Sequence, residues 1–142
     1  MAEEVSGPTE LAHRTALVLS PDDEAPARAR RLLRQLLGSR LDGELAAAEL
    51  VVSELVTNAV LHGQRAGMNA VGLTLEETSD TLRIEVTDRG PGFSQGGAAP
   101  GDPGGWGLVV VGELADRWGI ERARRGVRVW AELSLARRAD AA

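Results

Sequence analysis

The chain has 142 residues, enough for one domain with a buried core and too few for several domains. Hydrophobic residues make up 43% and charged residues 26%, which favours an ordinary soluble globular domain over disorder. The net charge of -5 argues against nucleic-acid binding, because nucleic-acid binders normally carry a basic face. No apolar run is long enough to span a membrane, and the first residues do not resemble a signal peptide. We therefore expect a cytoplasmic protein that does not bind membranes.

Several residue types that carry chemistry are missing or scarce. The absence of cysteine excludes disulfides, thiolate metal sites and cysteine nucleophiles. All 16 basic residues are arginine, and the absence of lysine excludes a Walker-A phosphate loop and Schiff-base chemistry. Two histidines, His13 and His62, are too few for an all-histidine zinc site. Any nucleotide must therefore be held in another way.

The first third of the chain contains a tail, a strand and a helix. Residues 1–11 are polar and lack an apolar period, so we expect them to form a flexible tail. A single domain is expected at 12–136, followed by a C-terminal tail at 137–142. A strand is predicted at 13–19. After a capping turn, apolar residues recur at helical spacing up to Leu37 with arginines opposite, which predicts an amphipathic helix.

A second helix is predicted from Glu44 to about Leu61, after a break at Gly38–Gly43. Its apolar residues occur nearly all round, so we expect it to lie inside the domain. Gly63 is placed to cap its C-terminus.

The rest of the chain predicts two hairpins and a third helix. Strands are expected at 69–76 and 81–87, a helix from Trp106 to about Trp118, and strands at 119–124 and 127–135. This order indicates an α/β (α+β) two-layer sandwich, with a mixed, mostly antiparallel sheet covered on one face by three helices. The tryptophans are expected to anchor the core or an interface; they are Trp106, Trp118 and Trp130.

The segment from Asp88 to Gly105 is rich in glycine and proline, which no packed element tolerates. Long loops in compact domains are usually functional. Such a loop buries too little apolar area to offset its ordering entropy, so we expect it to be mobile without a ligand.

One group of candidate functional residues lies on the second helix. Glu54, Asn58 and His62 are spaced i, i+4, i+8 and share one face of an otherwise apolar helix. Buried carboxylates and amides demand partners, which favours a site. Taken alone, the three residues can also be a solvated strip, and His62 can stabilise the helix dipole or accept a phosphate.

Two glycine-containing features complete the set. Asp88 follows a predicted strand and precedes Gly90 and Gly92. Its carboxylate can accept a hydrogen bond from an exocyclic amine, and the glycines let a flat base approach. The same residues can also simply form a turn. The run Gly104–Leu108 places free backbone N–H groups at a helix start, which is an anion site by geometry and dipole. Glycine pairs before helices are also common without a ligand.

In this order and spacing, the three features resemble the N, G1 and G2 boxes of the GHKL ATPase superfamily, which includes DNA gyrase and the sensor histidine kinases. Over about His13 to Leu135 the chain looks like the small, free-standing anti-sigma factor serine/threonine kinases. The strings Glu54–Gly63, Leu114–Gly119 and Val129–Leu133 are characteristic of that group. A sensor histidine kinase is not expected, because no dimerising helical hairpin fits in this length.

The resemblance implies a GHKL/histidine-kinase-like ATPase fold and a role for each matched residue. Asn58 would ligate Mg²⁺, Glu54 would orient or deprotonate the nucleophile, and Asp88 would hold the adenine amine of ATP. Gly90 and Gly92 would let the base approach. The other implied ATP-binding positions are Gly104, Gly105, Gly107 and Leu108, with the amides of Gly105 and Gly107 on the phosphates and the ATP lid between Phe93 and Gly104.

The resemblance also implies partners and an activity. The kinase would phosphorylate a STAS-type anti-sigma antagonist, would alternately sequester a sigma factor, and would form a homodimer. Two departures favour an alternative, a non-catalytic ATP-dependent protein-interaction module. Related kinases often carry a basic lid residue at the position where this chain has Asp102–Pro103. They also usually have Gly-Lys-Thr at the start of the last strand, whereas this chain has Gly126–Arg128 there and lacks the threonine.

Overall fold

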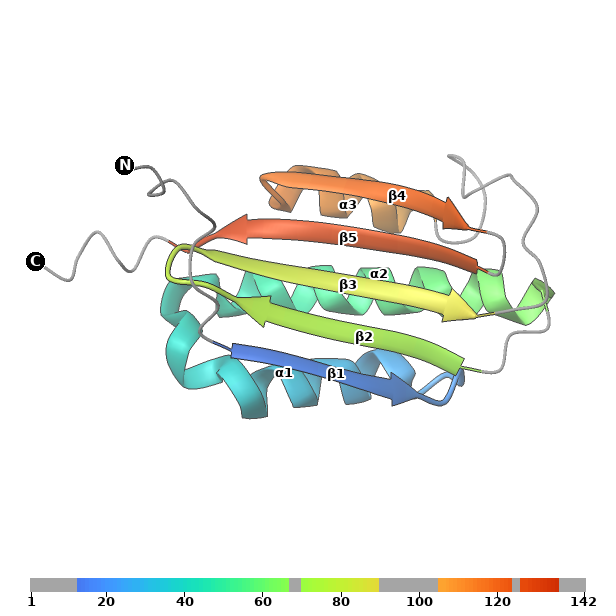
Figure 1. Cartoon of the computed structure of the whole chain (residues 1–142), viewed down its shortest axis with the longest axis horizontal. Helices are drawn as coiled ribbons and strands as arrows, with labels where there is room; N and C mark the ends of the chain where they lie inside the picture. The colour runs from blue at the N-terminus through green and yellow to red at the C-terminus, as the bar shows by residue number, and fades with distance from the viewer. Residues whose placement is uncertain (1–12, 67–69, 90–104, 124–125, 136–142) are drawn as a thin grey trace, which may run out of the picture.

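The computed structural model describes residues 13–66, 70–89, 105–123 and 126–135 (Figure 1). The elements in chain order are β1 (His13–Leu19), α1 (Ala25–Leu41), a 3-10 helix η2 (Asp42–Glu44), α2 (Leu45–Ala66), β2 (Ala70–Glu77), β3 (Thr81–Arg89), α3 (Gly105–Leu114), β4 (Arg117–Ala123) and β5 (Gly126–Ser134). Within these ranges, no helix combines the length and apolar character needed to cross a membrane.

The five strands form one sheet in the order β1-β2-β3-β5-β4. Each pair of neighbouring strands is antiparallel, so the described sheet is not mixed, as had been predicted, but antiparallel throughout. One sheet and one layer of helices confirm the predicted two-layer architecture. The helices cover one face of this sheet (Figure 1). Buried and half-buried residues alternate along β2, as the two-residue repeat of a strand with one covered face requires.

The central helix of the covering layer is α2, which lies between α1 and α3 (Figure 1). Its apolar side chains supply much of the core, as predicted. The fully buried ones are Ala48, Val51, Val52, Leu55 and Val56. An exception is Leu50, which is 44% exposed. Because α2 packs on the sheet and on both neighbouring helices, the fold sets the direction of its buried Asn58 side chain.

Two glycines that were expected to end helices do not. Helix α1 continues through Gly38 to Leu41, a fully buried residue one turn after the buried Leu37. Helix α2 continues through Gly63 to Ala66, so the prediction of Gly63 as a C-terminal cap is wrong. Glycine inside a helix costs about 1 kcal/mol relative to alanine, which tertiary packing along the helix readily overrides.

Helix α3 ends at Leu114, four residues before the predicted end. The chain leaves the helix at Asp116, whose N–H donates to the Glu132 carbonyl oxygen at 2.8 Å. The Asp116 carboxylate in turn accepts the Ser134 N–H at 2.6 Å. These bonds start the pairing with β5, so Trp118 belongs to β4, where its indole approaches Gly112 of α3.

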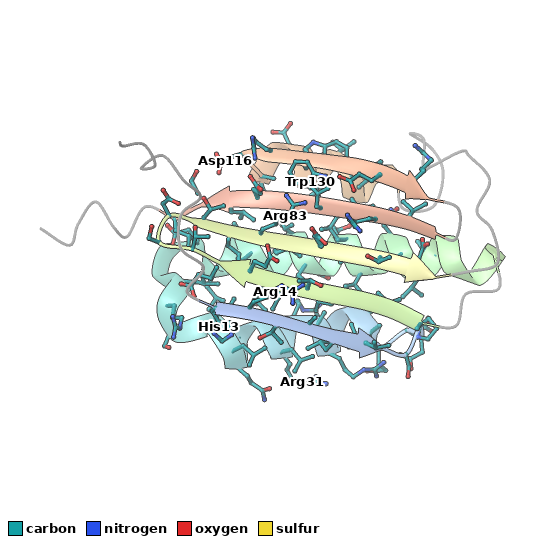
Figure 2. All side chains as sticks on the ribbon, viewed as in Figure 1. His13, Arg14, Arg31, Arg83, Asp116 and Trp130 are labelled. Carbon is teal, nitrogen blue, oxygen red and sulfur yellow. The ribbon has the colours of Figure 1, made fainter. Side chains whose placement is uncertain are left out.

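The face of the sheet opposite the helices carries paired charges. Arg14 contacts Glu76 at 2.9 Å, and Arg83 contacts Glu132 at the same distance. The Arg83 guanidinium lies 4.4 Å from the centre of the Trp130 ring, and both residues are labelled in Figure 2. Trp130 therefore lies on the uncovered face, outside the core.

Two of the arginines near the C-terminus are paired within this face. Arg117 contacts Glu132 at 2.7 Å, and Arg128 contacts Glu121 at 3.0 Å. A solvated face of balanced charge explains these two residues without a nucleic-acid partner.

Helices α1 and α2 are joined by an ion pair at their outer edge. The Arg34 guanidinium donates from Nε and Nη2 to the Glu49 carboxylate, at 2.8 and 2.9 Å. One turn away, Arg30 donates to the Ser53 hydroxyl at 2.8 Å. The hydrogen bonds from Arg34 lower the pKa of the Glu49 carboxyl from its ordinary value of 4.5.

This pair makes stability depend on pH in a defined direction. Because the pKa of Glu49 is lower in the folded protein, its contribution is fully present above pH 4.5 and is lost as the pH falls through the folded value. We expect the difference in free energy of unfolding between the wild type and Glu49→Gln to shrink from about pH 7 to about pH 3. Urea denaturation at both pH values measures it. Arg34→Gln should follow the same trend, and a difference independent of pH would contradict the assignment.

Candidate functional site

Asn58 lies on the flank of α2 that faces α3. Glu49 marks the opposite flank, because it pairs with Arg34 of α1. Asn58 follows Glu49 by nine residues, which at about 100° per residue is half a turn around the helix. Helix α2 lies between α1 and α3 (Figure 1). Helical spacing therefore places Asn58, and Glu54 one turn before it, on the α3 side of the helix.

The side chain of Asn58 is only 5% exposed. Its Oδ1 atom is buried and accepts no hydrogen bond from any residue that the structure describes. An unsatisfied buried acceptor costs about 1–3 kcal/mol, so such groups require an explanation. A neutral amide oxygen is also a ligand type that Mg²⁺ accepts in proteins. The geometry therefore fits a metal or another electron-pair acceptor at Oδ1.

Glu54 is half-buried on the same flank. Its carboxylate forms no hydrogen bond or ion pair that the structure records within the described ranges. A half-buried carboxylate held on a rigid helix can accept a proton or a hydrogen bond from a ligand. The side chain of His62, the third residue of this group, lies outside the described residues, although its backbone belongs to α2.

Asp88 lies inside β3 and not after it. The prediction that the strand ends at Thr87 is wrong, because pairing with β5 continues to Arg89, the register partner of Gly126. Asp88 is 6% exposed and faces the helical layer among apolar neighbours. Its Oδ1 accepts the backbone N–H of Val127 at 3.0 Å. The carboxylate is thus buried at the end of the sheet and held from β5.

The end of β3, the start of β5 and the C-terminal half of α2 lie at one end of the molecule (Figure 1). Helix α3 starts at Gly105, includes Gly107, and buries Leu108 against the core. Gly90, Gly92, Gly104 and the expected lid at 93–104 lie outside the described residues. The predicted roles of all these residues remain predictions.

Sequence reasoning missed the contact between β5 and Asp88. A Cβ on Gly126 would overlap the backbone carbonyl oxygen of Asp88, so only glycine fits there without a shift. The glycine that begins β5 was a visible signal. The donor to Asp88 was not, because every residue type except proline offers a backbone N–H.

Comparisons with known proteins show the fold and the family of this chain. A solved structure of the RsbU and RsbW domains of Rv1364c from Mycobacterium tuberculosis is similar at a TM-score of 0.68 and 21% identity, which shows a shared fold. The match covers 87% of this chain but only 32% of that chain, so the protein spans about a third of that neighbour. No curated protein matches. The model of the histidine kinase-like ATPase domain matches residues 19–133, from the end of β1 into β5, and the chain belongs to this family.

Proposed function

We propose that this protein binds Mg-ATP and acts as a regulatory serine/threonine protein kinase. The observation that carries the proposal is the buried Oδ1 of Asn58, which has no hydrogen-bond donor among the described residues, on the central helix of a histidine kinase-like ATPase domain. A domain that folds around such a group retains it at a cost in stability, and binding a ligand there repays that cost.

The residues present fit the nucleotide and its metal. Asn58 supplies an oxygen ligand for Mg²⁺, which when bound would neutralise charge on the phosphates. Asp88 supplies a buried acceptor for the amino group of adenine. The backbone amides at the start of α3, near Gly105 and Gly107, would contact the phosphates at the positive end of the helix.

Glu54 would act on the acceptor hydroxyl. The serine or threonine oxygen attacks the γ-phosphorus, the bond from that phosphorus to the bridging oxygen breaks, and ADP leaves. The proton of the hydroxyl passes to the Glu54 carboxylate. The rigid α2 backbone fixes Glu54 one turn from Asn58, so the chain would act on the reaction mainly by positioning the reacting groups.

The proposed acceptor is a STAS-type anti-sigma antagonist, and the proposed second partner is a sigma factor that the kinase sequesters. The shared fold with a structure containing an RsbW domain supports this assignment. A homodimer and a cytoplasmic location belong to the same proposal. Sedimentation of the purified protein, alone and with each partner, would test the assembly.

Transfer itself is tested with purified protein, Mg-ATP labelled at the γ-phosphate, and STAS proteins encoded near its gene. Phosphoserine or phosphothreonine on one of them supports the kinase. Calorimetric binding of ATP without any transfer favours the second candidate, a non-catalytic interaction module, which the acidic Asp102 in the expected lid motivates. Absence of nucleotide binding would overturn both.

A further inference from the structure

Strand β4 lies at one edge of the sheet, where it pairs only with β5 (Figure 1). Among the described residues, no backbone hydrogen bond reaches its other side. An open edge presents a row of N–H and C=O groups with which another strand can pair. The outer side of β4 is therefore a template for association unless its sequence guards it.

Exposed apolar side chains gather at this edge. Five large hydrophobic side chains are exposed in the described part of the chain, and three of them belong to α3 and β4, namely Val109, Leu114 and Trp118. The indole of Trp118 is 38% exposed and lies against Gly112 of α3, one turn after Val109. Helix α3 and β4 thus share an apolar border that a partner would cover.

The sequence around β4 is complementary to itself in the antiparallel direction about Gly119. When two copies pair with Gly119 at the centre, residues equidistant from it face each other and point to the same side of the sheet. Two pairs of opposite charge and one apolar pair result, and they are Arg117 with Glu121, Asp116 with Arg122, and Trp118 with Ile120. A shift of two residues in either direction leaves neither arginine opposite a carboxylate.

These pairs continue a pattern that each sheet already has. Arg117 contacts Glu132 of β5 at 2.7 Å, and Glu121 contacts Arg128 at 3.0 Å. Placing Arg117 of one copy opposite Glu121 of the other extends the alternation of opposite charges from one sheet to the next. Arg122 is exposed and forms no ion pair recorded among the described residues, so it is available to a second copy.

We propose that two copies of this chain associate through β4, paired antiparallel about Gly119 so that the two sheets join edge to edge. The inference rests on the homodimer of the proposed function and names its surface. Such an interface is the same patch on both copies, as a two-fold axis requires. The opposite edge strand, β1, contains no acidic residue and offers no comparable pairing. Backbone hydrogen bonds would join the strands, and the side-chain pairs would set the register.

Sedimentation equilibrium of the full chain and of two charge-reversed variants tests the interface. Glu121→Arg and Arg117→Glu each turn two symmetry-related attractions into repulsions, so each should weaken self-association by about thirtyfold or more. An equal mixture of the two variants should associate as the wild type does. In the mixed dimer, one copy presents arginine at both positions and the other presents glutamate at both, so every facing pair is complementary again.

The matched control is Arg14→Glu, which reverses a charge on the other edge strand and also breaks one ion pair of the uncovered face. It should dimerise as the wild type does. Equal weakening by this control would indicate stacking of the uncovered faces and overturn the edge pairing. Wild-type association of both β4 variants, or no rescue in their mixture, would overturn it as well.

Amide hydrogen exchange of the wild type tests the interface without any substitution. Dilution that dissociates the dimer should speed exchange along β4 and leave β1 unchanged, which decides the matter even if a variant does not fold. Unchanged exchange along β4 would overturn the edge pairing. A wild type that stays monomeric throughout the micromolar range would overturn the homodimer and this interface together, while nucleotide binding and phosphoryl transfer keep their own tests.

Discussion

Replacing Glu54 with glutamine is expected to slow phosphoryl transfer to the acceptor protein by about a hundredfold to ten-thousandfold. Glutamine has nearly the same shape but cannot take the proton of the attacking hydroxyl. The substitution breaks no hydrogen bond or ion pair recorded among the described residues, so the fold should be preserved. Affinity for Mg-ATP should change little, because the role proposed for Glu54 is toward the acceptor.

Single-turnover transfer with excess kinase measures the chemical step free of product release. The matched control is Glu113→Gln, which removes the same charge from an exposed position on α3. Its transfer rate should equal that of the wild type. If Glu54→Gln transfers at close to the wild-type rate, another residue accepts the proton.

Asn58→Leu is expected to have opposite effects on stability and on ligand binding. Leucine removes from α2 a buried oxygen that has no donor among the described residues, so the free energy of unfolding of the nucleotide-free protein should rise by about 1 kcal/mol or more. The same change removes the proposed metal ligand, so the part of the ATP affinity that requires Mg²⁺ should disappear. Urea denaturation and ATP titrations with Mg²⁺ or with EDTA measure the two effects.

Asn58→Asp is the informative counterpart. It keeps an oxygen ligand but places a charge at a site that is only 5% exposed, so it should destabilise the nucleotide-free protein and retain the Mg²⁺ dependence. A leucine variant that loses stability would show that the Asn58 amide contributes more to the fold than the unsatisfied oxygen costs. Retained Mg²⁺ dependence in that variant would remove Asn58 from the metal site.

The elements of the fold could be predicted from the sequence because their periods are strong. β1 has the predicted ends, His13 and Leu19, since turn residues follow the apolar run directly. The end of α3 could not be predicted, because Asp116 leaves the helix to bond with Glu132 and Ser134, which are distant in the chain. The pattern of residues along the chain indicates only local conformational preference, whereas the end of α3 depends on tertiary hydrogen bonds.

The same limit applies to the candidate site. Residue type and spacing indicated that Asn58 and Asp88 are special. They could not indicate that Asn58 Oδ1 has no donor among the described residues, because that depends on how the neighbouring elements pack around it. Nor could they indicate the bond from Val127, because a backbone N–H is the same in nearly every residue.

The antiparallel pairing of β3 with β5 closes a long loop of chain whose ends, Arg89 and Gly126, are register partners. The entropy of closing such a loop grows only with the logarithm of its length, so doubling the length costs about 0.6 kcal/mol. The sheet register, and not the chain between, sets where Asp88 lies. Insertions, deletions or exchanges within 90–104 should thus leave the end of the sheet that holds Asp88 in place. The expected lid could therefore be exchanged by design without displacing Asp88.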